Sequence, residues 1–198
     1  MTDFDRQAAA DRAGALIPTP SQTVGPFFGY ALPYEDDSQI RAPWHPDSIR
    51  FHGVVTDGEG AVVPDAIVEV WGAGVDGRPS TARGSLDRDT HGFTGFGRAA
   101  VDRSGHFSFD TVKPGAGEKS APYLVLAIFA RGLLHHLYTR AYFDDETLAN
   151  DVDPLLERID TSRRNTLFAL PDGDRSYRFD IRLQGENETV FLDFGTEQ

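Results

Sequence analysis

The chain has 198 residues, which is enough for one domain that buries roughly 70% of the surface exposed by its unfolded form. A formal charge of -12 and a pI near 4.8 argue against nucleic acid and anionic membrane as partners, because phosphate binding needs clustered Lys and Arg. The chain contains no cysteine, which excludes a disulfide framework, a thiolate metal site and a thiol nucleophile.

The N-terminal part of the chain predicts a leader followed by an arm. Residues 1–17 are small and polar without sustained periodicity, which predicts a flexible leader or, alternatively, a short helix through 8–15. No signal-peptide core or membrane-spanning stretch is seen, so we expect a cytoplasmic protein. Five prolines between 18 and 44 forbid a long helix and predict an extended arm. We expect 18–198, including this arm, to form a single domain.

Strand signals recur along the rest of the chain. Apolar runs that end in turn residues predict short strands at 51–55, 66–71 and 106–112. Two longer apolar runs predict a hairpin between Ser120 and Phe143, with Arg131 in its turn. Apolar and charged residues then alternate through 177–183, which predicts a half-buried edge strand. A last strand is expected at 189–194.

Helical signals are few. Acidic residues before 147–149 predict one short helix, and Pro154 predicts another because proline is favoured at the first helical position. The pattern as a whole predicts an all-β fold, a β-sandwich of mainly antiparallel strands. An extended N-terminal arm and a few short helices in loops complete it.

Several segments share their order and sequence with one known family. They are residues 19–26 (TPSQTVGP), 68–71 (VEVW), 96–98 (FGR), 112–115 (VKPG), 129–132 (FARG), 142–145 (YFDD), 178–182 (RFDIR) and 184–191. Over about 18–194 the chain resembles the intradiol ring-cleavage dioxygenases, and residues 19–26 favour the alpha side of the two-chain members. That resemblance implies the β-sandwich that the strand pattern also predicts.

The resemblance also implies how metal is handled. Family members hold a non-haem Fe(III) with two tyrosines and two histidines, a hard oxygen and nitrogen set that suits ferric iron. The equivalent positions in this chain are Pro79, Gly117, Tyr123 and Val125. The resemblance therefore implies that this chain supplies no catalytic residue and no metal ligand, and that a partner beta chain holds the iron.

The histidines offer no obvious replacement for that ligand set. His135 and His136 are neighbours, and neighbours on a strand point to opposite faces, so they are not expected to share one ion. The remaining histidines are expected to be isolated surface or hydrogen-bonded residues: His45, His52, His91 and His106.

The resemblance further implies a substrate site where the alpha and beta chains meet. Arg131 would attract the carboxylate of protocatechuate, the catechol-type substrate that is cleaved with O2 in the beta-ketoadipate pathway. Gly25 and Pro26 would let the main chain approach the flat ring, and Thr23 is a possible hydrogen-bond partner. A large alpha-beta hetero-oligomer is the implied assembly.

Two alternatives stay open on sequence grounds. Residues 53–70 fit a non-catalytic binding module of the prealbumin or carboxypeptidase-regulatory type equally well. The arm and the hairpin favour the dioxygenase family, because a plain module has no reason to carry them. A self-sufficient intradiol enzyme is opposed by the residues at the four ligand-equivalent positions.

Overall fold

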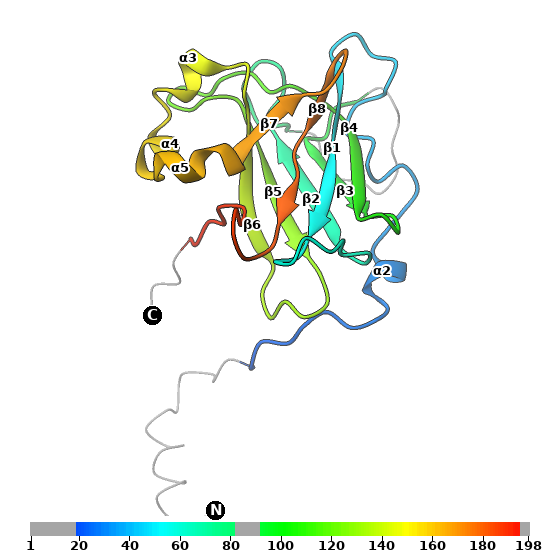
Figure 1. Ribbon diagram of the computed structural model, residues 1–198. Helices are drawn as coiled ribbons and strands as arrows, with labels where there is room; N and C mark the ends of the chain where they lie inside the picture. Colours follow the sequence, from blue (N-terminus) through cyan, green and yellow to red (C-terminus); the bar gives the residue numbers. More distant parts are fainter. Residues whose placement is uncertain (1–18, 82–91, 195–198) are drawn as a thin grey trace, which may run out of the picture.

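The computed structural model describes residues 19–81 and 92–194 of the chain (Figure 1). The leader predicted at 1–17 lies outside these residues. The strands are β1 (Ser48–Thr56), β2 (Ile67–Gly72), β3 (Phe96–Ala100), β4 (His106–Val112), β5 (Tyr123–Phe129), β6 (Leu137–Phe143), β7 (Phe168–Pro171), β8 (Ser176–Arg178) and β9 (Ile181–Arg182). The predicted strands at 51–55, 66–71 and 106–112 and the predicted hairpin are all confirmed.

The strands form one curled sheet in the order β3-β2-β5-β6-β7-β8-β1-β4, with β9 also paired to β1. Five of the eight strand pairings within the described residues are antiparallel. The two end strands, β3 and β4, contact each other, so the sheet folds over on itself as a sandwich. The predicted β-sandwich of mainly antiparallel strands is therefore confirmed.

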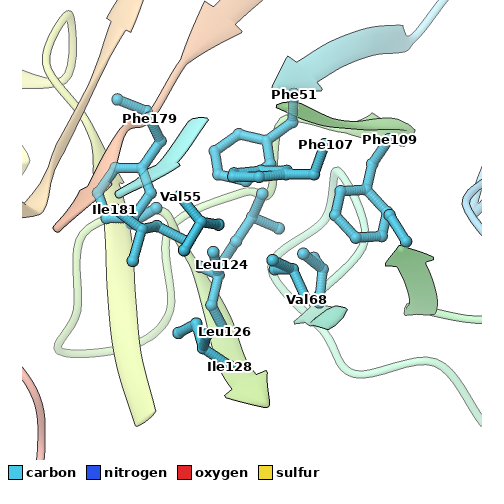
Figure 2. Packing of buried hydrophobic residues seen from close by; sticks show 14 of the residues in the cluster. Phe51, Val55, Val68, Phe107, Phe109, Leu124, Leu126, Ile128, Phe179 and Ile181 are labelled. Carbon is cyan, nitrogen blue, oxygen red and sulfur yellow. The ribbon is translucent and has the colours of Figure 1, made fainter. Parts of the chain in front are cut away.

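The main core lies between the two halves of this curled sheet. Every second residue of a strand points inward, so the large apolar side chains of β1 and β4 meet those of β2 and β5 (Figure 2). The side chains labelled in that view are all buried: Phe51, Val55, Val68, Phe107, Phe109, Leu124, Leu126, Ile128, Phe179 and Ile181. This core holds β5 in place, and β5 contributes Tyr123 and Val125 to the wall of a cavity at its first end.

The pattern at 177–183 predicted one half-buried edge strand, and the structure corrects this. The segment forms two short strands, and β8 lies between β7 and β1, parallel to β1. The backbone just after β8 lies so close to β1 that a Cβ on Gly53 would be 1.8 Å from the carbonyl oxygen of Phe179. The alternation of apolar and charged residues indicates which side chains are buried. It does not indicate whether a strand pairs with one neighbouring strand or with two.

The strand predicted at 189–194 is also wrong. This segment forms only an isolated bridge, between Leu192 and Tyr138. Two backbone bonds, from the Thr189 amide to the Arg182 carbonyl and from the Leu192 amide to the Tyr138 carbonyl, hold the segment. Side-chain bonds supplement them, because the Thr189 hydroxyl accepts from the Arg182 amide at 2.9 Å and the Thr139 hydroxyl donates to the Val190 carbonyl at 2.8 Å.

Short helices decorate the sheet. They are α2 (Phe28–Ala31), α3 (Thr147–Asn150), α4 (Pro154–Arg158), α5 (Thr161–Arg164) and the 3-10 turn η1 (Asn165–Leu167). The two predicted short helices correspond to α3 and α4, and α4 has Pro154 in its first turn as expected. Helix α4 and the turn η1 contribute Leu156 and Leu167 to a second apolar cluster around Tyr142. None of the helices in the described ranges has the length and apolar character that crossing a membrane requires.

A buried histidine on β1 predicts a pH dependence of stability. His52 is 8% exposed, and burial lowers its pKa below the ordinary value, with positive charge on Arg50 and His106 acting in the same direction. Its Nε2 atom lies 2.9 Å from Asp172, which acts in the opposite direction. A lowered folded-state pKa means that the unfolded chain binds the proton more readily at acid pH.

The free energy of unfolding should therefore fall as the pH drops below the ordinary histidine pKa, about 6.5. Urea unfolding of the wild type and of His52→Gln at about pH 8 and pH 5 checks this. The variant should lose less stability than the wild type between the two values, and His135→Gln, at an exposed site, should behave like the wild type. Parallel losses in the wild type and His52→Gln would contradict the assignment.

Candidate functional site

The arm lies against the turn of the β5–β6 hairpin (Figure 1). The Thr23 hydroxyl accepts a hydrogen bond from the Gly132 amide at 2.8 Å, and the Ser21 hydroxyl lies 3.0 Å from Nε2 of His135. Gly132 has a φ of +94°, a left-handed conformation that favours glycine. The arm and this glycine together fix the shape of the turn that carries Arg131.

Arg131 and Pro26, two of the residues predicted to bind substrate, line a shared pocket of about 300 Å³. The Arg131 side chain is 59% exposed, and its Nε atom contacts the carboxylate of Asp65, which lines the same pocket. A Cβ on Gly25 would meet no atom within 4 Å. The structure thus gathers Thr23, Pro26 and Arg131 around one turn, and the Gly25 carbonyl beside them accepts a hydrogen bond from the Phe28 amide at 3.3 Å.

Asp65 was missed by the sequence reasoning. It lies 66 positions before Arg131, and nothing near it in the sequence marks it as more than a turn residue ahead of a strand. Helix α2 also contributes to the pocket wall, where Phe28, Gly29 and Tyr30 line it. Tyr30 is 86% exposed and the adjacent Phe27 is 75% exposed, so apolar surface surrounds the pocket entrance.

A second cavity, of about 410 Å³, lies at the other end of β5. All four ligand-equivalent positions line it: Pro79, Gly117, Tyr123 and Val125. They come from the loop after β2, the loop before β5 and β5 itself. The sequence resemblance therefore selected residues that are close in space, although they span 47 positions of the chain.

These residues do not fit a ferric ion. Among the described residues that line the cavity, Tyr123 offers the one phenol, and the other side-chain donors are the neutral hydroxyls of Ser80, Thr94 and Ser120. Ferric iron is held by anionic oxygen and imidazole ligands, and neutral hydroxyls are a poor substitute. Throughout 19–81 and 92–194 there is no group of three or more His, Cys, Asp or Glu that could hold a metal ion.

A positive charge next to Tyr123 adds to this mismatch. The guanidinium carbon of Arg140 lies 4.0 Å from the centre of the Tyr123 ring, and its Nη1 atom donates to the Tyr142 hydroxyl at 3.2 Å. A cation stacked on the Tyr123 ring opposes the approach of a second cation. No pattern in the sequence distinguishes Arg140, because it lies within an ordinary strand, β6.

A buried carboxylate holds the wall of this cavity. Asp153 is 1% exposed and accepts hydrogen bonds from the Ala121 amide and the Tyr142 hydroxyl, each at 3.0 Å. It also caps α4 by accepting from the amides of Leu155 and Leu156. Burial raises the pKa of Tyr142 above its ordinary value, which keeps this hydroxyl protonated as a donor. The sequence indicated the helix, but it did not indicate that its cap also binds the cavity loop.

The histidines differ from expectation in two respects. His135 and His136 precede β6, which begins at Leu137, so the argument from strand geometry was wrong. The two rings nevertheless have different surroundings, because His136 packs against the Phe129 and Tyr138 rings at 5.3 Å and 4.5 Å.

Two histidines expected to be isolated are in fact neighbours. Nε2 of His106 lies 3.3 Å from Nδ1 of His52. His45 lies beside Arg41 and Asp47, as expected of a hydrogen-bonded residue. His91 lies outside the described residues.

Comparison with known proteins gives consistent results. A family model described as "Dioxygenase" matches residues 25–122. The protocatechuate 3,4-dioxygenase alpha chain of Burkholderia cepacia is 40% identical over 195 residues, covering 90% of this chain and 98% of the relative. The beta chain from the same organism is 29% identical over 152 residues, covering 69% and 64%. An intradiol ring-cleavage dioxygenase from Tetranychus urticae aligns with a TM-score of 0.58 at 15% identity, covering 84% of this chain and 94% of that structure.

The fold is thus that of the intradiol ring-cleavage dioxygenases. Within that class, identity is higher to the alpha chain than to the beta chain and extends over almost the whole alpha chain. This chain belongs to the family of protocatechuate 3,4-dioxygenase alpha chains. The comparisons therefore favour the dioxygenase family over the binding module that the sequence left open.

Proposed function

We propose that this chain is the alpha subunit of a heteromeric protocatechuate 3,4-dioxygenase whose beta subunit holds a non-haem ferric iron. The enzyme would cleave the ring between the two hydroxyls of protocatechuate, inserting both atoms of O2 to give 3-carboxy-cis,cis-muconate. That reaction belongs to the cytoplasmic beta-ketoadipate pathway. The iron of the partner would supply the oxygen chemistry, and this chain would bind and orient the substrate.

The distance between Arg131 and the cavity around Tyr123 is the observation that carries this proposal. Tyr123 lines the cavity at the start of β5, and Arg131 follows the end of the same strand. Six residue steps at about 3.3 Å place the two ends of β5 roughly 20 Å apart. Arg131 is therefore too distant to bind a molecule held in that cavity. An arginine held at the hairpin turn fits a substrate site completed by another chain.

The charge of the chain supports the role of Arg131. A net charge of -12 repels an anionic aromatic acid over most of the surface. A guanidinium offers two parallel donors to a carboxylate, so it can attract the substrate and fix its orientation. Pro26 would close the pocket beside the ring and Thr23 would hold the turn, which limits the access of water to the substrate.

The pocket entrance has the surface expected of a subunit contact. Phe27 and Tyr30, next to the pocket, are 75% and 86% exposed. Aromatic side chains are enriched at subunit interfaces because they bury a large apolar area on association. These residues support an alpha-beta hetero-oligomer in which the beta chain covers this face.

Expression of the chain alone and together with its beta-type partner tests the proposal. We expect the isolated chain to contain no stoichiometric iron and to leave protocatechuate intact. The co-expressed complex should contain iron, show tyrosinate-to-iron absorption and consume protocatechuate and O2 in equal amounts. Metal analysis and oxygen uptake are the measurements.

Two results would contradict the proposal. The first is one ferric ion per isolated chain with tyrosinate-to-iron absorption, because that places the metal in this chain. The second is a co-expressed complex that binds iron and has no activity toward protocatechuate. A Tyr123→Phe variant of the complex serves as a control. It should keep both the absorption and the activity, because the tyrosinate belongs to the partner.

A further inference from the structure

We propose that Asp65 is a positioning residue that holds Arg131 by one edge of its guanidinium and leaves the other edge for a ligand carboxylate. This inference rests on the proposed function and adds a residue to its substrate site. The Asp65 carboxylate lines the same pocket as Arg131 and contacts the Arg131 side chain directly.

The contact uses one specific atom of the arginine. The Asp65 carboxylate contacts Nε of Arg131, and within the described residues neither Nη1 nor Nη2 of Arg131 donates a hydrogen bond. A guanidinium has five N–H donors in a planar fork. With Nε bound, the end formed by Nη1 and Nη2 still presents two parallel donors, the arrangement that binds a second carboxylate bidentately.

The backbone next to Asp65 is anchored on its C-terminal side. Asp65 lies between Pro64 and Ala66, which is 1% exposed and whose carbonyl accepts from the Val101 amide at 3.0 Å. The Asp65 side chain is 26% exposed, whereas that of Arg131 is 59% exposed. The carboxylate is therefore the more sheltered partner and Arg131 the one that faces outward.

The arm constrains the same arginine through its backbone. The bond from the Gly132 amide to the Thr23 hydroxyl fixes the turn directly after Arg131. Asp65 fixes the side chain, so the two contacts together restrict the guanidinium before any ligand arrives. An arginine restricted in advance loses less conformational freedom on binding, which favours affinity.

If Asp65 competed with the substrate instead of positioning Arg131, its removal would change the KM for protocatechuate in the opposite direction. If its carboxylate competed with the substrate for Arg131, removing it would free the arginine and lower the KM for protocatechuate. A positioning role predicts a higher KM. The contact at Nε favours positioning, because a competitor would occupy the Nη1–Nη2 edge that a ligand carboxylate needs.

The test is Asp65→Asn in the complete alpha-beta complex. We expect the KM for protocatechuate to rise about fivefold with kcat little changed, since a positioning contact acts on substrate binding. The dissociation constant for protocatechuate, measured without O2, should rise by a similar factor. Catechol, which lacks the carboxylate, should show no change. Asp65→Glu, which retains the charge, should recover part of the loss.

Asp151→Asn is the matched control, because it removes one negative charge at α3, toward the other end of the sheet (Figure 1). It should leave both substrates unaffected. An unchanged or lowered KM for protocatechuate in Asp65→Asn overturns the inference, and so does an equal rise for catechol. A wild-type complex that does not cleave protocatechuate overturns the proposed function together with this inference. An active wild type with an unaffected Asp65→Asn overturns the inference alone.

Discussion

Replacing Arg131 by alanine should raise the KM of the alpha-beta complex for protocatechuate by about 10- to 100-fold. Hydrogen bonds between charged groups contribute about 1.5–3 kcal/mol, and each 1.4 kcal/mol corresponds to about a factor of ten in binding. The change in kcat should be small, because Arg131 binds the carboxylate and not the ring carbons that react. Catechol should keep its KM, since it has no carboxylate to lose.

Arg178→Ala is a suitable control for this prediction. The Arg178 side chain is 52% exposed and pairs with Asp180, so it resembles Arg131 in exposure and in having an aspartate partner. It lies on β8, outside the hairpin turn, and its removal should leave both substrates unaffected. Equal rises in KM for protocatechuate and catechol in Arg131→Ala would show that the variant disturbs the interface and not carboxylate recognition.

Salt provides a second measurement on the same variant. An exposed guanidinium and a carboxylate are screened by dissolved ions, with a Debye length of about 8 Å at physiological ionic strength. The wild-type KM for protocatechuate should therefore rise with salt more steeply than the KM of Arg131→Ala. A salt response that the variant shares in full would mean that other charges attract the substrate.

Local patterns predicted most of the sheet. Strands β1, β2 and β4 and the β5–β6 hairpin have alternating or apolar runs that end in turn residues. A few consecutive residues are therefore enough to predict each of these strands. The segment 177–183 was placed incorrectly at an edge. Its position between β7 and β1 depends on Gly53, which lies more than 120 positions earlier and leaves room for the Phe179 backbone.

Some residues of the candidate site could be predicted from nearby sequence, and others could not. Family motifs predicted Arg131 and Pro26, and the structure brings them to one pocket. Asp65 and Arg140 could not be predicted, because each matters through a partner that only the tertiary fold brings close. A carboxylate before a strand and an arginine within one have no distinguishing local pattern.

The two hollows at the ends of β5 have different chemistry. The cavity around Tyr123 has no charged side chain among the described residues that line it, whereas the pocket at the hairpin turn contains Arg131 and Asp65. The Arg140 guanidinium near that cavity is stacked on the Tyr123 ring and hydrogen-bonded to Tyr142, whereas Arg131 itself lines its pocket and is 59% exposed, so a carboxylate can reach it. The chain thus keeps the family fold, and Arg131 and Asp65 lie together toward the end of β5 that is opposite to Tyr123.

Replacing Asp153 by alanine should lower the free energy of unfolding by about 3–5 kcal/mol. This is the typical cost of removing a buried charged group and leaving its hydrogen-bond donors without an acceptor. Four donors lose their acceptor together: the Tyr142 hydroxyl and the amides of Ala121, Leu155 and Leu156. Asp153→Asn should lose less, because its amide oxygen can still accept. Urea unfolding with the linear extrapolation measures both variants.

Asp160→Ala separates this effect from simple loss of a helix cap. Asp160 caps α5 by accepting from the Ser162 amide, but it is exposed, so water can replace the lost bond. Its loss should be much smaller than that of Asp153→Ala, and similar losses in the two variants would contradict a special role for Asp153. Because Asp153 also binds the Ala121 amide, its removal should loosen the loop that borders the cavity. Amide exchange at Ala121 should accelerate in Asp153→Ala and stay unchanged in Asp160→Ala.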